Sequence, residues 1–165
     1  ERIVLGKGSF GGTNAGRTGI ALTRPFPEDG YELLLEAVSL DYNGDFGIDF
    51  PVGQSRTYTW CGAAGFQFDG RGLDGVTNLP MDNAPYIWHL VRLRVTPEKV
   101  EAWVDDQPMV NLPRAVEKFQ KRPALAATPF RLCTYPLGAF RNIRLRQLRP
   151  EAPAAAPAPP APKQP

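Results

Sequence analysis

The chain has 165 residues, of which 42% are hydrophobic and 22% charged, which is enough for one domain with a sizeable core and too little for two. Nineteen Lys and Arg side chains oppose seventeen Asp and Glu, and a net charge of +2 is too balanced to indicate a nucleic-acid or anionic-membrane partner. The apolar runs fall far short of the ~20 residues of a membrane span. Sixteen glycines and 18 prolines punctuate short β-branched and aromatic runs, which favours an all-β sandwich.

Glycine-rich sequence separates the first two predicted strands, residues 2–5 and 18–23. It contains a G-x-G-x-x-G pattern that starts at Gly6, and residues 45–47 match the Asp-Phe-Gly tripeptide of kinases. The chain nevertheless lacks the Val-Ala-Ile-Lys strand and the His-Arg-Asp motif that accompany this loop in kinases. We therefore interpret the first 17 residues as a turn-rich lead-in to the domain.

Two longer strands are predicted over residues 31–38 and 46–52, because apolar side chains recur there at every second position. The predicted core faces carry Tyr31, Leu33, Leu35 and Ala37 in the first strand and Phe46, Ile48, Phe50 and Val52 in the second. Between them, Asn43 and Gly44 form the dipeptide typical of a hairpin turn.

The same turn imitates the start of a calcium-binding loop, since Asp41, Asn43 and Asp45 alternate as its first ligands do. Phe46 stands where that loop requires glycine, and Val52 where it requires glutamate. We therefore expect no cofactor, with Ca²⁺ as the weaker alternative.

Residues 56–61 predict a further strand, and residues 64–68 a short one within the irregular stretch 62–85. A loop of this length in a compact domain is often functional. Its polar side chains include Asp69, Arg71 and Asp74.

The clearest element is a hairpin over residues 88–105. With residues 96–99 as the loop, the pairs are Val95 with Val100, Arg94 with Glu101, Leu93 with Ala102, Arg92 with Trp103 and Val91 with Val104. One face is then apolar and the other charged, and a slip by one residue would bury unpaired charges. We expect Trp103 to point outward beside Arg92, in cation–π contact.

Residues 109–112 are predicted to extend the second strand of this hairpin, and residues 115–120 to form at most one helical turn. Two closing strands follow, over 130–135 and 139–148, with Ile143 and Leu145 directed inward. From residue 150 the sequence is almost entirely proline and alanine, which predicts an extended tail or linker. The domain is thus expected to span residues 1–149, and residues 150–165 to tether it or dock on a partner.

The hairpin string WHLVRLRVTPEKVEAWVDDQP, together with AFRNIRL near the end, resembles the concanavalin A-like lectin/glucanase superfamily, which includes laminin-G-like jelly rolls. The bacterial 3-keto-disaccharide hydrolase-like domains are the most similar branch. The resemblance covers about residues 18–148 and implies a two-sheet antiparallel jelly-roll sandwich whose concave face often takes carbohydrate. The Glu-x-Asp-x-x-Glu signature of the glucanases is missing from the sequence, which weighs against catalysis.

The carboxylates do not form an evident catalytic pair. Four strand residues separate Glu101 from Asp105, about 13 Å, whereas the two carboxyls of a glycosidase lie about 5 to 10 Å apart. Asp49 or the loop acids could complete a pair only through folding that the sequence does not specify. The single histidine, His89, has the parity of the core residues, so we expect it to be buried and hydrogen-bonded, and one histidine with two distant cysteines does not make a zinc site.

Two functions of different class follow from these patterns: a non-catalytic module that recognises a glycan or protein surface, and a structural or accessory subunit of a larger assembly. A glycoside or 3-keto-sugar hydrolase comes third. Candidate ligand-binding residues are Trp103, Arg92, Trp60, Asp69, Arg71 and Asp74. Exposed aromatic rings stack on sugars while polar side chains bind their hydroxyls.

Cys61 and Cys133 are the only cysteines. An even pair in a turn-rich sandwich is typical of an exported protein with one disulfide. We therefore expect an extracytoplasmic location and a possible Cys61–Cys133 bridge.

Overall fold

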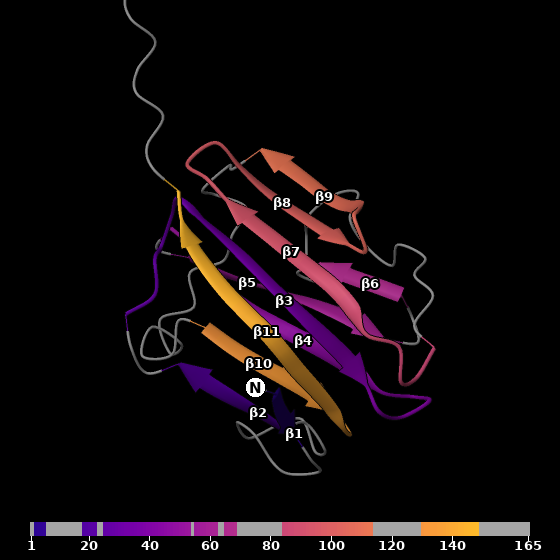
Figure 1. Ribbon diagram of the computed structural model, residues 1–165. Coiled ribbons are helices and arrows are strands. Elements are labelled where there is room, and N and C mark those ends of the chain that lie inside the picture. Colours follow the sequence, from indigo (N-terminus) through magenta and orange to yellow (C-terminus); the bar gives the residue numbers. More distant parts are fainter. Residues whose placement is uncertain are drawn as a thin grey trace, which may run out of the picture.

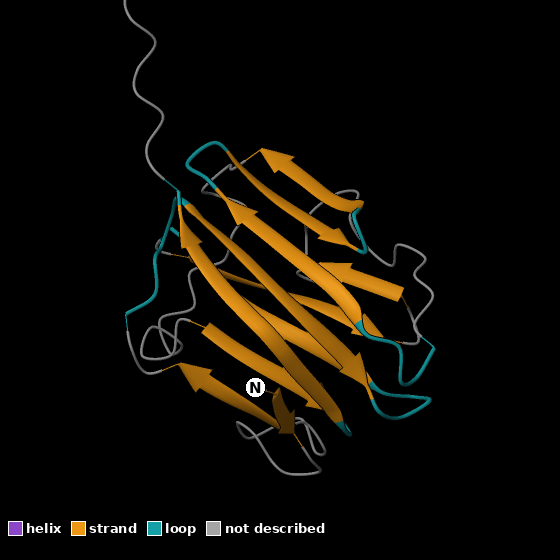
Figure 2. Cartoon of the chain, viewed as in Figure 1, coloured by secondary structure: helices purple, strands orange, loops and turns teal. Residues whose placement is uncertain are grey.

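A computed structural model describes residues 2–5, 18–22, 25–53, 55–62, 65–68, 84–113 and 130–148. Within these residues the chain is all-β, as predicted, and folds into two antiparallel sheets, one lying in front of the other in Figure 1. Strands joined by loops and turns account for this part of the chain, and Figure 2 shows no helix there. None of it could therefore cross a membrane as a long apolar helix.

The six-stranded sheet contains, in spatial order, β1 (Arg2–Leu5), β11 (Gly138–Gln147), β3 (Tyr31–Ser39), β7 (His89–Val95), β8 (Lys99–Val104) and β9 (Gln107–Pro113). The five-stranded sheet contains β2 (Thr18–Leu22), β10 (Phe130–Tyr135), β4 (Asp45–Val52), β5 (Ser55–Gly62) and β6 (Gly65–Phe68). The chain crosses repeatedly between the sheets, as expected of a jelly roll.

The period-two pattern of the sequence builds the core between the sheets. The core faces predicted for β3 and β4 are buried, and the large side chains Tyr31, Phe46 and Phe50 are fully inaccessible. Tyr31 also donates a hydrogen bond from its hydroxyl to the Pro51 carbonyl in the opposite sheet, at 2.6 Å. Apolar burial therefore joins the layers, and the one buried phenol has its polar atom satisfied.

The central hairpin has the predicted register, with Val95 opposite Val100 and Arg92 opposite Trp103. Its apolar face is fully buried, whereas Trp103 lies half-buried on the outer face. The Arg92 guanidinium carbon lies 4.1 Å from the centroid of the Trp103 ring. The predicted cation–π contact is confirmed.

Two predicted connections are wrong. Asn43-Gly44 forms a turn, in which the Gly44 N–H donates to the Asp41 carbonyl at 3.0 Å, but this turn carries the chain from one sheet to the other because β3 and β4 do not pair. Residues 107–113 do not prolong β8. They fold back as β9 through Asp105 and Asp106, whose φ angles of 50° and 62° fit a two-residue hairpin turn.

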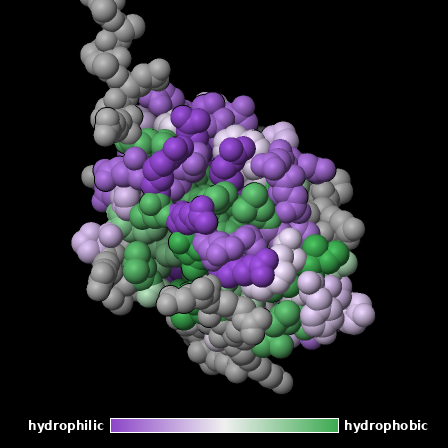
Figure 3. Space-filling model, viewed as in Figure 1, coloured by the Kyte–Doolittle hydropathy of each residue, from purple (hydrophilic) through white to green (hydrophobic). Residues whose placement is uncertain are grey.

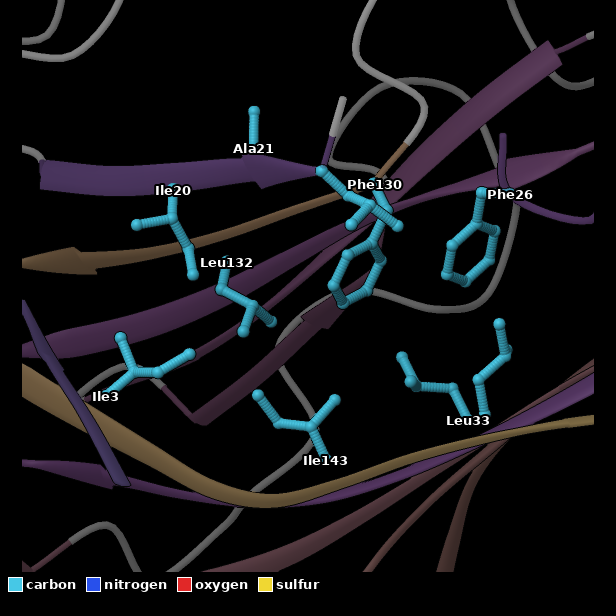
Figure 4. A pocket seen from close by; sticks show the side chains of 10 residues that line it. Ile3, Ile20, Ala21, Phe26, Leu33, Phe130, Leu132 and Ile143 are labelled. Atoms are coloured by element: carbon cyan, nitrogen blue, oxygen red, sulfur yellow. The ribbon is translucent and has the colours of Figure 1, made fainter. Parts of the chain in front are cut away.

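The core opens at the end formed by β1, β2, β10 and β11. Leu145 pairs with the core residue Leu33, so it faces inward as predicted, yet it is 44% exposed, and Ile143 is 38% exposed. Ile143 lies in a β-bulge between Arg141 and Arg144 that bends the strand. A cavity of about 270 Å³ lies here, lined almost entirely by apolar side chains (Figure 4).

Four sequence predictions lie outside the described residues: most of the glycine-rich lead-in, the helical turn over 115–120, most of the irregular stretch 62–85, and the tail 150–165. The domain limit at residue 149 stays a prediction.

Candidate functional site

The outer face of the five-stranded sheet carries aromatic and charged side chains side by side. In β4 the apolar residues point inward, so Gly47 and Asp49 point outward. Gly47 pairs with Trp60, and Asp49 pairs with Tyr58 in β5. On its other side, Asp49 pairs with Arg131 in β10. Gln67 in β6 pairs with Trp60. Four neighbouring strands thus present these side chains on one surface, which we call the Trp60 face (Tyr58, Trp60, Asp49, Arg131 and Gln67).

Arg131 and Asp49 form an ion pair at the β10 side of this face. The Arg131 Nε and a terminal guanidinium nitrogen both donate to Asp49 Oδ2, at 2.9 and 2.6 Å. Only 19% of the Arg131 side chain and 11% of the Asp49 side chain are exposed, so the charges attract one another in a medium less polar than water. Such a doubly hydrogen-bonded pair holds its groups in a defined orientation.

Glycine at position 47 makes room for the indole of Trp60. A Cβ atom on Gly47 would lie 2.6 Å from two carbons of the Trp60 ring, closer than any van der Waals contact allows. The Trp60 and Tyr58 rings lie 6.4 Å apart, inclined at 66°. Trp60 also pairs with Gln67 in the neighbouring strand β6. The Trp60 ring therefore lies against the sheet, next to a second aromatic ring and a polar amide.

The structure separates the predicted ligand residues into two groups. Trp60 lies on the outer face of the five-stranded sheet, whereas Trp103 and Arg92 lie on that of the six-stranded sheet, with the core between them. One small ligand cannot contact both tryptophans. The other predicted residues, Asp69, Arg71 and Asp74, lie outside the described part of the chain.

The predicted disulfide is wrong, because Cys61 and Cys133 are both free and buried. Cys61 pairs with Phe46 of the core face, and Cys133 pairs with Gly47 of the outer face. The two thiols therefore point to opposite sides of the sheet. Strand β4 lies between them, which separates their Cα atoms by about 10 Å, or two strand spacings, too far for a bridge.

We expect the Cys61 thiol to be unreactive in the folded protein. Burial, with Asp105 and Asp45 adding repulsion, raises the pKa of this thiol above its ordinary value, so the reactive thiolate is scarce at neutral and mildly alkaline pH. Titration with Ellman's reagent at pH 8 should leave Cys61 unmodified in buffer and detect two thiols per chain in denaturant. A disulfide-linked peptide in a non-reducing digest would contradict this expectation.

His89 is buried and hydrogen-bonded, as predicted. Its Nδ1 lies 2.7 Å from Asp105 Oδ2, and its side chain is 4% exposed. The other oxygen of Asp105 accepts the Leu90 N–H at 2.8 Å, so this carboxylate fastens the turn before β9 to the start of β7. The sequence predicts that Asp105 lies on one strand with Glu101. In the structure Asp105 lies in the turn that follows β8. The described residues contain no cluster of three His, Cys, Asp or Glu side chains suited to a metal ion.

No family model matches the chain, and no curated protein matches it. Among solved structures it is similar to a Bacillus subtilis protein of unknown function with a galectin-like fold, at a TM-score of 0.56 and 11% identity over 89% of both chains. It is also similar to the carbohydrate-binding module CBM66 from Bacillus subtilis, at 0.54 and 12% over 80% of this chain and 83% of that one. A third similar structure comes from a study of endo-acting O-glycanases that members of the human gut microbiota express to initiate mucin breakdown, at 0.54 and 18% over 90% and 79%. These likenesses show the fold alone, a two-sheet jelly-roll β-sandwich.

Proposed function

We propose that this domain is a non-catalytic recognition module that binds a glycan on the Trp60 face. The observation that carries the proposal is the placement of Trp60 and Tyr58 beside the Arg131–Asp49 ion pair on one sheet surface. Indole and phenol rings stack on the C–H surface of a sugar, and a charged pair held in place offers both a donor and an acceptor to its hydroxyls. Strands hold such groups more rigidly than loops do.

The predicted residues Asp69, Arg71 and Asp74 belong to this proposal, because their segment follows β6 of the same sheet in the chain. An extracytoplasmic location and a relation to the 3-keto-disaccharide hydrolase-like domains also belong to it. Hydrolysis is the less favoured function, since the glucanase signature is missing and Asp49 is engaged by a guanidinium at hydrogen-bond distance. A general acid must reach the glycosidic oxygen of a substrate, whereas this carboxylate is held toward Arg131.

We expect Trp60→Ala to weaken glycan binding by about 1–3 kcal/mol, the scale of a buried aromatic contact. A glycan array identifies the ligand, and calorimetry then measures the loss for Trp60→Ala and Tyr58→Ala. Trp103→Ala is the matched control, because it removes an indole from the opposite face of the sandwich.

Three results would contradict the proposal. Equal losses for Trp60→Ala and Trp103→Ala would show that the Trp60 face is not the site. A blank array together with recovery of a stable protein assembly would favour the structural-subunit function. If the domain hydrolyses a glycoside or 3-keto-sugar and an Asp-to-Asn variant loses that activity, the domain is an enzyme.

A further inference from the structure

The outer face of the six-stranded sheet carries an excess of positive charge, although positive and negative side chains nearly balance in the whole chain. Alternation along β3, β7, β8 and β11 directs six cationic side chains to this side, namely Arg92, Arg94, Lys99, Arg141, Arg144 and Arg146, against three carboxylates, Glu32, Glu36 and Glu101. The excess of three exceeds the net charge of +2 of the entire chain. Figure 3 views this face, and hydrophilic side chains cover much of it with hydrophobic ones between them.

All three carboxylates already have cationic partners. Glu36 accepts hydrogen bonds from Asn142 and Arg141, and these contacts, with that from Asn142 the larger, hold the pKa of Glu36 below its ordinary value. Glu32 binds Arg146 at 3.0 Å. Glu101 binds Lys99 at 2.7 Å. The anionic groups of the face are therefore neutralised within the protein.

Three arginines are left without a carboxylate partner among the described residues: Arg92, Arg94 and Arg144. Arg144 and Arg92 are both in register with Leu34 of the strand between them, which places their Cα atoms about 10 Å apart, or two strand spacings. Arg94 lies two residues further along β7, about 7 Å from Arg92. The three guanidinium groups thus span several strands of a sheet surface.

The ring of Trp103 holds the Arg92 side chain in place. Its guanidinium packs on the Trp103 ring at 4.1 Å, and its buried Nε has no hydrogen-bond partner. Arg94 and Arg144 are exposed, so both can contact a molecule that lies on the sheet.

We propose that this surface, which we call the arginine face (Arg92, Arg94 and Arg144), binds an acidic polysaccharide through its carboxylate or sulfate groups. The planar guanidinium donates paired hydrogen bonds to such groups, and charges spread across strands fit a polymer that repeats its anionic group better than a single small anion. A single-stranded nucleic acid is less favoured, since its bases stack on open aromatic rings and Arg92 covers a face of Trp103. The arginine face is separate from the Trp60 face, so this proposal does not depend on the proposed function.

Calorimetry on the full chain tests the proposal with two probes, an oligogalacturonate for carboxylate and a heparin-derived oligosaccharide for sulfate. We expect at least one of them to bind, more weakly as salt rises, and Arg94→Gln/Arg144→Gln to weaken that binding about tenfold or more. The slope of log Kd against log salt should fall by about two, one for each lost cation. Neither residue is buried, so the variant should fold.

Two controls make the result specific. The Arg94→Lys/Arg144→Lys variant retains the charge and should retain the salt slope while losing affinity, because an ammonium lacks the guanidinium fork. Trp60→Ala should leave acidic-polysaccharide binding unchanged, which separates this site from the Trp60 face. Absence of binding to both probes, unchanged binding by the Gln variant, or tighter binding of a thymidine oligonucleotide of equal charge would overturn the proposal.

Discussion

Replacing Phe46 by alanine will lower the free energy of unfolding by about 3–5 kcal/mol, the range for truncating a fully buried phenylalanine. Phe46 is inaccessible to solvent and projects from β4 toward the other sheet. There its ring makes an edge contact with Phe140, at a centroid distance of 6.3 Å, and a tilted contact with His89 at the same distance. The cavity left by alanine would remove dispersion contacts from both layers at once.

Urea denaturation followed by fluorescence measures this loss as a lower midpoint with an unchanged m-value. Phe46→Leu retains most of the volume and should cost about 1–2 kcal/mol. Tyr42→Ala is the matched control, because that ring lies in the adjacent turn and is 76% exposed. A loss below about 1 kcal/mol for Phe46→Ala would show that the contacts between the sheets are looser than described.

Replacing Asp49 by alanine will cost about 2–4 kcal/mol, because it removes the carboxylate that balances a largely buried guanidinium. The expected cost lies somewhat below that of a fully buried pair, since 19% of the Arg131 side chain still reaches solvent. The same variant should abolish ligand binding on the Trp60 face. Arg131 would lose the two hydrogen bonds that it donates to this carboxylate.

A double-mutant cycle with Asp49→Ala and Arg131→Met measures the interaction free energy between these two side chains, apart from their interactions with the rest of the protein. We expect the double variant to be more stable than the sum of the single losses predicts, with a coupling energy of at least about 1 kcal/mol, because removal of both charges leaves neither buried alone. Strict additivity would show that the two hydrogen bonds contribute nothing to folding. Asp49→Asn retains the shape and tests whether binding needs the charge.

The elements that depend on local sequence could be predicted. The 88–105 hairpin has matched pairs within a few residues of its turn, so periodicity alone fixed the register that the structure has. The return of the chain at Asp105-Asp106 was missed, because two aspartates adopt positive φ less readily than the Asn-Gly and Asp-Gly pairs that mark such turns. Conversely, Asn43-Gly44 marked a real turn without revealing that the chain changes sheets there.

The candidate sites depend on strand order, which the sequence does not state. Arg131 meets Asp49 across 82 residues of chain, and only the placement of β10 beside β4 brings them together. Strand order and register also decide whether the two cysteines can form a disulfide. The composition suggests that they do, but the register directs their thiols to opposite sides of the sheet. Trp60 could be selected from the sequence as an aromatic next to a loop, and the period of a strand puts Tyr58 on the same face. Their neighbour Arg131 could not be found in this way.

Strand β9 influences how the domain behaves at high concentration. It is the last strand in the order of the six-stranded sheet, and the outermost strand of a sheet can recruit a strand from another molecule. Pro108 and Pro113 lie within it, paired with Trp103 and Lys99, and neither offers an N–H to an incoming chain. At these two positions the edge therefore lacks the N–H with which a strand of another molecule would pair.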